Sequence, residues 1–267
     1  MDNRAIGVLD SGVGGLTVLR EIIKQVPAEN TVYFGDTMRF PYGPKDLEDV
    51  KGYVSKAAEF LLEKDVKMVV IACNTGSVAA LDYLKSHVDL PVIGVIEPGA
   101  RTAVKNTSNK RVGVIATKGT VDSRAYEKEM MKIDPGIKTF SAAAPVLIEY
   151  VENGLLEGEK LQRQIKRYLL PLLEQEIDVL VLGCTHFPLI EKQILKVSGD
   201  NIRVINSAME TAKDVRSLLI QRDMTADAGN KAKRLFYETA DKSNFFKTGQ
   251  MFLGREIRQI IKTRLDI

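Results

Sequence analysis

The first half of the chain alternates short apolar runs with segments in which apolar residues recur at helical spacing. The apolar runs predict buried strands over residues 5–10, 31–35, 66–72 and 91–96. The segments between them predict helices over residues 16–26, 46–63 and 76–86. Because strands that alternate with helices form βαβ units, this pattern predicts a mainly parallel sheet.

The second half repeats this plan. Strands are predicted over residues 111–116, 138–142, 177–183 and 203–206, and helices over residues 99–104, 122–132, 161–174 and from near Pro188. The tail is predicted to form a helix at 209–221, a strand at 235–238 and a final helix at 252–264. We expect this tail to return to the first domain, which gives one domain over residues 1–97 plus 208–267 and a second over 98–207.

Three short segments occur twice, in the same order and at similar offsets. The matching pairs are residues 6–12 with 112–118, 70–75 with 181–186, and 91–96 with 202–207. Such a repeat predicts an α/β protein of two similar domains, each with a mainly parallel sheet and related by a pseudo-twofold axis. The functional site is expected in the cleft between them.

The second pair of segments contains the only two cysteines of the chain, Cys73 and Cys184. A lone cysteine at the end of an apolar run is most simply a small core residue, since free cysteine is among the most buried residue types. Here both cysteines stand where a predicted strand gives way to Asn, Thr or His. Ligands bind outside the carboxyl ends of the strands in open parallel sheets, so the pair favours a cleft with one thiol on each side.

Composition and charge argue against several classes of protein. The chain has 267 residues, of which 45% are hydrophobic, as in ordinary globular proteins. Its 38 basic and 35 acidic residues nearly balance, so neither nucleic acid nor an anionic membrane is an expected partner. No run has the ~18 apolar residues of a membrane span, and the amino terminus lacks a secretory signal pattern. We therefore expect a cytoplasmic protein whose cysteines stay thiols, with no metal site.

The residues around the two cysteines suit proton transfer and anion binding. Both cysteines precede predicted helix starts, where the helix dipole and free amides lower the pKa of a thiol. Asn74, Thr75 and Thr185 carry side chains that cap helices. The same groups, together with free backbone amides, would hold a small carboxylate.

Asp10 ends the first strand and precedes a glycine-rich loop at residues 11–15. The loop lacks the spacing of a nucleotide-binding motif, so a tight turn that needs positive φ is the plainer interpretation. Asp10 is expected to face the same cleft as Cys73, where it could accept a proton from the thiol or bind a substrate ammonium group.

The two histidines have different predicted roles. His186 follows Cys184 by two positions and could poise that thiol or bind a carboxylate. The alternative is that His186 only caps the helix near Pro188. His87 lies in a polar connector and is predicted to be a surface residue.

With these residues, the sequence resembles the cofactor-independent glutamate racemases of bacteria. The resemblance extends over nearly the whole chain, including weaker matches at residues 150–154, 210–212 and 236–239. The principal matching stretches are residues 10–17 (Asp-Ser-Gly-Val-Gly-Gly-Leu-Thr), 35–37 (Gly-Asp-Thr), 41–44 (Pro-Tyr-Gly-Pro), 72–75 (Ala-Cys-Asn-Thr) and 183–186 (Gly-Cys-Thr-His).

The resemblance implies an isomerase that interconverts L- and D-glutamate without a cofactor. Cys73 and Cys184 would be the two acid/base groups, with Asp10 as helper beside Cys73, and His186 with Glu152 as helpers beside Cys184. Substrate contacts would come from Asp10, Ser11, Tyr42, Gly43, Asn74, Thr75, Thr185 and His186. The implied partner is glutamate alone, the implied assembly is a homodimer, and the implied product role is D-glutamate for peptidoglycan and the cell wall.

The sequence departs from the usual family pattern at a few positions. Gly76, Ser77, Phe187 and Ala144 replace residues that are more common in the family, and Phe40 and Asn206 also differ. None of these changes removes a proposed acid or base, but they alter the pocket. Residues 142–145 and Glu149 depart from the stretch that normally positions Glu152.

Three alternatives stay open at the level of sequence. An aspartate racemase shares the two-cysteine plan but typically has Glu at the position of His186. A two-lobed amino-acid-binding protein could use the same halves without catalysis, although such proteins usually carry an export signal. A cysteine hydrolase could use Cys184 with His186, and this would leave Cys73 unexplained.

Overall fold

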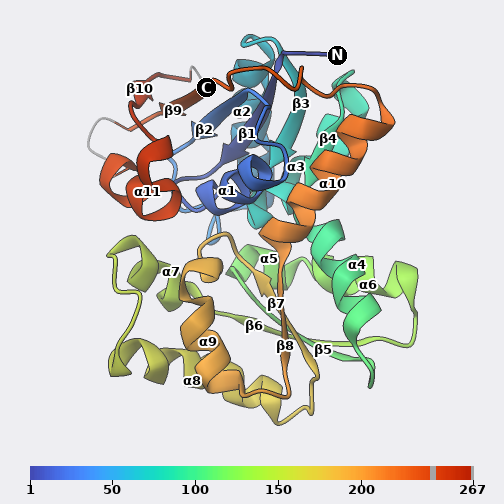
Figure 1. The fold of residues 1–267 in the computed structure, drawn as a ribbon. Helices are drawn as coiled ribbons and strands as arrows, with labels where there is room; N and C mark the ends of the chain where they lie inside the picture. The colour runs from blue at the N-terminus through green and yellow to red at the C-terminus, as the bar shows by residue number, and fades with distance from the viewer. Residues whose placement is uncertain (241–244, 266–267) are drawn as a thin grey trace.

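The structure is a computed structural model that describes residues 1–240 and 245–265. In that part of the chain the strands form two parallel sheets, which lie in the upper and lower lobes of the molecule in Figure 1. Sheet A has the strand order β10-β9-β2-β1-β3-β4, and sheet B has the order β6-β5-β7-β8. The predicted α/β class with two parallel sheets is therefore confirmed.

Each strand predicted from the apolar runs is present, with shifts of a few residues at the ends. Sheet A contains β1 (Ala5–Asp10), β2 (Thr31–Gly35), β3 (Val66–Ile71), β4 (Val92–Gly94), β9 (Arg234–Glu238) and β10 (Ile261–Lys262). Sheet B contains β5 (Arg111–Ala116), β6 (Lys138–Ala143), β7 (Val179–Gly183) and β8 (Arg203–Asn206). The central strands β1, β3, β5 and β7 are almost entirely buried, which explains their continuous apolar runs.

Helices cover both faces of sheet A. One layer holds α1 (Leu16–Gln25), α10 (Ser207–Gln221) and α11 (Phe245–Leu253), and the other holds α2 (Leu47–Leu62) and α3 (Asn74–His87). Side chains of β1 point to opposite faces of the sheet. Ile6 and Val8 pack in the same core cluster as Leu16 of α1, whereas Leu9 packs in the cluster that contains Val50 of α2.

Sheet B is covered in the same way. One face carries α4 (Ile96–Asn106) and α6 (Ala125–Ile133), and the other carries α7 (Pro145–Glu152), α8 (Glu159–Leu173) and α9 (Glu191–Ser198). The helix predicted at 122–132 is divided into the short α5 (Lys118–Asp122) and α6, because Arg124 between them adopts a left-handed backbone with φ +55°. The α7 helix is absent from the sequence prediction.

The chain passes between the lobes twice. It leaves sheet A after β4 through α4 and returns after β8 through α10, and these two helices pack against each other. In Figure 1 the blue amino-terminal and red carboxyl-terminal segments share the upper lobe. This path follows the expected return of the tail to the first lobe. The boundaries at residues 97/98 and 207/208 stay a prediction.

The predicted final helix over residues 252–264 is wrong. The α11 helix ends at Leu253 and is followed by the short η2 turn (Gly254–Glu256) and then by β10. Gly254 adopts a left-handed backbone with φ +58°, which ends the helical path. Ile257 then turns into the core, and Ile261 pairs with Tyr237 at the edge of sheet A. The β-branched isoleucines suit this edge strand.

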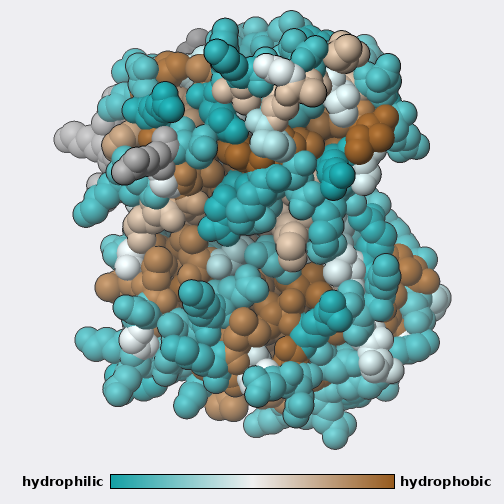
Figure 2. All heavy atoms as spheres, in the orientation of Figure 1, coloured by the Kyte–Doolittle hydropathy of each residue, from teal (hydrophilic) through white to brown (hydrophobic). Residues whose placement is uncertain are grey.

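No helix within residues 1–240 and 245–265 combines the length and apolar character needed to span a membrane. The face drawn in Figure 2 is mainly hydrophilic, with hydrophobic residues interspersed among polar ones. A mixed surface of this kind is usual for a folded globular protein.

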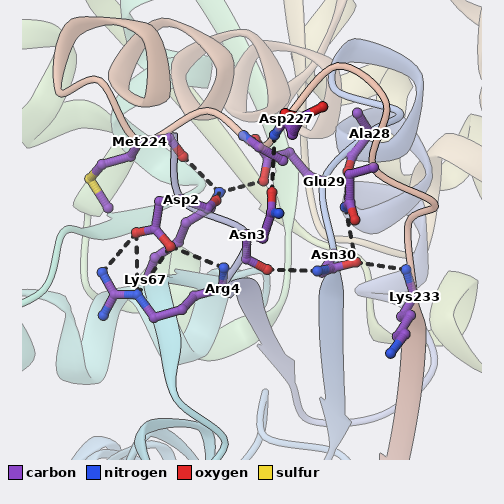
Figure 3. A network of polar contacts seen from close by, with 12 residues as sticks. Asp2, Asn3, Arg4, Ala28, Glu29, Asn30, Lys67, Met224, Asp227 and Lys233 are labelled. Carbon is purple, nitrogen blue, oxygen red and sulfur yellow. Dashed lines mark hydrogen bonds and ion pairs between the residues drawn. The ribbon is translucent and has the colours of Figure 1, made fainter.

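A buried lysine joins several segments near the amino-terminal ends of the strands of sheet A (Figure 3). Lys67 of β3 is fully buried, and its Nζ donates hydrogen bonds to the carbonyl oxygens of Asp2 at 2.6 Å and Met224 at 2.7 Å. The same Nζ lies 2.5 Å from Glu29 Oε2, while Glu29 Oε1 accepts a hydrogen bond from the backbone N–H of Ala226. Lys67 therefore links the chain start to the segment after α10.

Replacing Lys67 by Met should lower the free energy of unfolding by about 3–5 kcal/mol, because the change leaves the Glu29 carboxylate buried without its cation. Urea denaturation of the two proteins measures this loss. The double variant Lys67→Met/Glu29→Gln should recover part of it.

Lys56→Met is the matched control, since the pair of Lys56 with Glu59 is exposed and should contribute little. A Lys67→Met protein as stable as this control would contradict the role given to the buried pair.

Candidate active site

Cys73 stands at the N-cap of α3, directly after β3, and is 6% exposed. Its sulfur accepts a hydrogen bond from the backbone N–H of Gly76 at 3.3 Å, and its thiol lies 3.9 Å from Ser11 Oγ. A Cβ at position 76 would lie 3.1 Å from the Cβ of Cys73, so glycine leaves the space for this close approach. The predicted position of Cys73 at a helix start is confirmed.

Cys184 follows β7 and is 5% exposed. The prediction that it precedes a helix start is only partly met, because the next element is the short η1 turn (Phe187–Ile190) and α9 begins at Glu191. Its polar partner is a side chain instead: Cys184 Sγ lies 3.7 Å from His186 Nδ1.

His186 connects Cys184 to Glu152. Its Nε2 lies 2.5 Å from Glu152 Oε1, at the end of α7, and its side chain makes no capping hydrogen bond to η1. The interpretation of His186 as only a helix cap is therefore wrong. Burial by itself would lower the pKa of His186, but the hydrogen bonds and charges of Cys184 and Glu152 outweigh burial and raise this pKa to about 10. The raised pKa favours the protonated form of the ring.

The two cysteines line one small cavity, although they come from different sheets. Its volume is about 20 Å³, which is room for about one water molecule. Both cysteines are free thiols. The other lining residues are Ser11, Phe40, Pro41, Tyr42, Gly43, Asn74, Thr75, Thr117, Ile148, Thr185 and His186. The cleft expected from the repeated segments is thus present, with one thiol from each lobe.

A larger cavity of about 430 Å³ adjoins the small one. The residues that line both are Phe40, Pro41, Gly43, Thr117 and Ile148. Glu152 also lines this outer cavity, so the carboxylate that holds His186 lies on the approach to the thiols. Two further cavities, of about 260 and 340 Å³, lie beside α4 and contain neither cysteine.

Asp10 is 1% exposed and is not among the residues that line the small cavity. Its Oδ2 accepts a hydrogen bond from the backbone N–H of Gly12 at 3.0 Å, while Oδ1 has no hydrogen-bond partner among the described residues. Burial raises the pKa of Asp10 against the opposing charge of His186. Burial and the nearby Asp10 charge together raise the pKa of the Cys73 thiol far above its usual range. The expectation that Asp10 faces the same cleft as Cys73 is therefore wrong, because its carboxylate is buried and does not line the cavity.

The glycine-rich loop is explained by close packing. The interpretation that it needs positive φ is wrong, because the described glycines with positive φ lie elsewhere, at positions 154, 158, 199 and 254. A Cβ on Gly14 would lie 2.4 Å from Thr185 Oγ1 and 2.5 Å from His186 Cε1. A Cβ on Gly15 would lie 2.5 Å from the Cβ of Asp10. The loop thus brings β1 against the Cys184 turn of the other lobe.

All predicted substrate-binding residues except Asp10 line the cavity, and several of them are already fixed by hydrogen bonds. Thr75 Oγ1 lies 2.8 Å from Thr117 Oγ1 of the other lobe. Tyr42, which lines the cavity, donates its hydroxyl to Asp36 Oδ2 at 2.7 Å. His87, predicted to be a surface residue, is exposed on α3.

Four residues that line the cavity were not predicted as site residues from the sequence: Phe40, Pro41, Thr117 and Ile148. A signal for Thr117 was present, because it occupies the position of Ser11 in the repeated segments 6–12 and 112–118. Phe40 packs its ring 5.9 Å from that of His186 and Ile148 comes from the unpredicted α7, so neither had a recognisable local pattern.

Comparisons with known proteins agree with this arrangement. The model of the family described as Asp/Glu/Hydantoin racemase matches residues 6–215. A glutamate racemase of Geobacter metallireducens is 41% identical over 263 residues, which cover 98% of this chain and 97% of the relative. The match extends over nearly the full length of both proteins.

Solved structures give the same result. Glutamate racemase isoform RacE1 from Bacillus anthracis aligns with a TM-score of 0.93 at 43% identity, covering 100% of this chain and 99% of that one. A glutamate racemase from Francisella tularensis, solved in complex with D-glutamate, also aligns with a TM-score of 0.93, at 34% identity and with the same coverage. This chain therefore belongs to the Asp/Glu/hydantoin racemase family and is an amino-acid racemase, an isomerase.

Proposed function

We propose that this protein interconverts L- and D-glutamate, with Cys73 and Cys184 as the two acid/base groups. The observation that carries the proposal is that the two cysteines, from different sheets, line one cavity. Inversion of a stereocentre needs two such groups, because a single base returns the proton to the face it left. Relatives named as glutamate racemases match nearly the whole chain, which supports glutamate as the substrate.

The proposed reaction is a pair of proton transfers. One sulfur, as a thiolate, removes the α-proton: an S–H bond forms as the Cα–H bond breaks, and the electron pair stays on the α-carbon. The other sulfur, as a thiol, delivers its proton to the opposite face. The two sulfurs exchange protonation states in each turnover, and the reverse reaction uses them in the opposite order. We propose that no cofactor takes part.

The two cysteines have different charged neighbours. Burial and the Asp10 charge hold the proton on Cys73, whose pKa is raised. Cys184 Sγ lies 3.7 Å from Nδ1 of His186, whose pKa is also raised, so a protonated ring would stabilise negative charge that develops on this sulfur. Asp10 and the His186–Glu152 pair would be the helpers on the two sides.

The proposed substrate contacts are the polar groups of the cavity wall. The α3 amino terminus with Asn74 and Thr75 suits a carboxylate, and Ser11 and Thr185 add hydroxyl groups from the two lobes. Asp10 retains one carboxylate oxygen without a described partner, which could receive a proton passed through Cys73 or Ser11. Tyr42, Gly43 and His186 complete the proposed set.

The product role that we propose is the supply of D-glutamate for peptidoglycan, and so for cell-wall biogenesis and cell shape. A homodimeric assembly is implied by the same resemblance, a cytoplasmic location was expected from the sequence pattern, and both stay predictions. A direct comparison of glutamate with aspartate as substrates separates this proposal from an aspartate racemase.

Cys73→Ser and Cys184→Ser should each reduce kcat for glutamate racemisation by more than about a hundredfold, because a serine hydroxyl is a far weaker acid than a thiol and does not ionise near neutral pH to supply a base. Circular dichroism of L- or D-glutamate measures the loss. In deuterated water the wild-type protein should place deuterium at the α-position of the product, without added pyridoxal phosphate or metal.

Thermal unfolding of each serine variant serves as the folding control. Turnover within about tenfold of wild type in either variant would refute the two-thiol scheme.

The contribution of His186 to stability should depend on pH. The pKa of His186 is raised from the ordinary 6.5 to about 10 in the folded protein. A raised pKa stabilises the fold fully below the unfolded value of about 6.5, and this contribution is lost as pH rises through about 10. The difference in unfolding free energy between wild type and His186→Gln should therefore be largest near neutral or lower pH and shrink in alkali.

Urea denaturation at a series of pH values from about 6 to about 10.5 measures this difference. In Glu152→Gln the fall should occur at lower pH, because one of the groups that raise the pKa of His186 is gone. A difference that stays constant with pH would exclude the imidazolium.

A further inference from the structure

Tyr126 of α6 occupies a slot between two glycines. The residue is 2% exposed, and a Cβ on Gly183 would lie 2.9 Å from its Cε2 atom. A Cβ on Gly99 of α4 would lie 3.4 Å from its Cε1 atom. Gly183 directly precedes Cys184, so the ring of Tyr126 packs against the backbone that presents one of the two thiols.

The hydroxyl of Tyr126 reaches the other thiol-bearing turn. It accepts a hydrogen bond from Asn74 Nδ2 at 2.9 Å, and Asn74 directly follows Cys73. The same hydroxyl lies 3.0 Å from Ser207 Oγ, at the start of α10 where the chain returns to sheet A. Tyr126 therefore touches both strand-end turns and both of the helices, α4 and α10, through which the chain crosses between the lobes.

The direction of this hydrogen-bond chain can be assigned. Ser207 Oγ donates to the carbonyl oxygen of Leu182 at 3.3 Å, and a carbonyl only accepts. The Tyr126 hydroxyl must then donate to Ser207 and accept from Asn74. The NH₂ end of the Asn74 amide is thereby directed toward Tyr126. Burial raises the pKa of Tyr126 far above its usual range, so the hydroxyl keeps the proton that it donates.

We propose that Tyr126 is a positioning residue for racemisation, which holds the Asn74 side chain in its binding orientation and fixes the Cys73 turn relative to the Cys184 turn. The proposal rests on the function proposed above, in which Asn74 contacts the substrate. Tyr126 does not line the cavity, so it acts through its neighbours. None of the sequence patterns singled it out.

Tyr126→Phe tests the proposal, because it keeps the ring between the glycines and removes only the hydroxyl. KM for both glutamate enantiomers should rise roughly three- to tenfold, the range expected for one hydrogen bond, with a smaller change in kcat. The double variant Asn74→Ala/Tyr126→Phe should have the KM of Asn74→Ala alone, since the hydroxyl acts through the amide. KM effects that multiply independently would overturn the proposal.

Thr107→Val is the matched control for lost stability. Thr107 donates its hydroxyl to Asp178 Oδ1 at 2.6 Å at the amino-terminal end of β7, whereas Cys184 follows the carboxyl end of the same strand. It should lower the thermal unfolding temperature without changing KM. If Thr107→Val raised KM as Tyr126→Phe does, the effect would be one of general destabilisation and the proposal would fail.

A crystal structure of Tyr126→Phe gives a readout that does not depend on activity. The Asn74 amide should rotate away from its wild-type position in this variant. An unchanged Asn74 amide would overturn the positioning role, even if KM had risen. Absence of glutamate turnover in the wild-type protein would instead overturn the proposed function, and the crystallographic comparison would still decide the role of Tyr126.

Discussion

The site depends on one constraint, which is the close packing of the turn after β1 in sheet A against the turn after β7 in sheet B. Gly14 meets Thr185 and His186 so closely that no side chain fits between them. Around this contact, Thr17 Oγ1 donates to the carbonyl oxygen of Thr185 at 2.9 Å, and the backbone N–H of Gly119 donates to the carbonyl oxygen of Gly43 at 2.9 Å. These contacts bring a buried thiol from each lobe to one cavity. Any loss of this packing would separate the two sulfurs.

The two lobes are alike in their backbone plan but different in charge. In the repeated segments Asp10 corresponds to Ala116, and His186 corresponds to Thr75. One cysteine therefore has a buried carboxylate nearby, and the other has an imidazolium. A symmetric fold with unlike neighbours therefore places two chemically identical side chains in different electrostatic surroundings, which is what the proposed two-base inversion would use.

The strands and the two cysteines could be predicted because continuous apolar runs and their polar ends are local signals. Glu152 was reached only through family resemblance, since it stands 34 residues from His186 and no spacing relates them. The predicted final helix was wrong because the apolar spacing over 252–264 fits a helix, although Gly254 ends the helical path. Ile261 then pairs with β9 as a strand. The reason for the glycines at residues 11–15 could not be predicted, because Gly14 is required by its close contact with Thr185 and His186 of the other lobe. The role proposed for Tyr126 could not be predicted, because the residues that it contacts, Asn74, Ser207 and two glycines, are distant from it in the sequence.

The small size of the thiol cavity has a consequence for the traffic of substrate. A space of about 20 Å³ has no room for an amino acid, so under the proposed function the walls would have to move apart and connect the outer cavity with the inner one before glutamate could enter. Both enantiomers would use this same gate. A change that eases the gate therefore speeds the forward and reverse reactions alike, and mirror-image molecules still reach equal amounts at equilibrium.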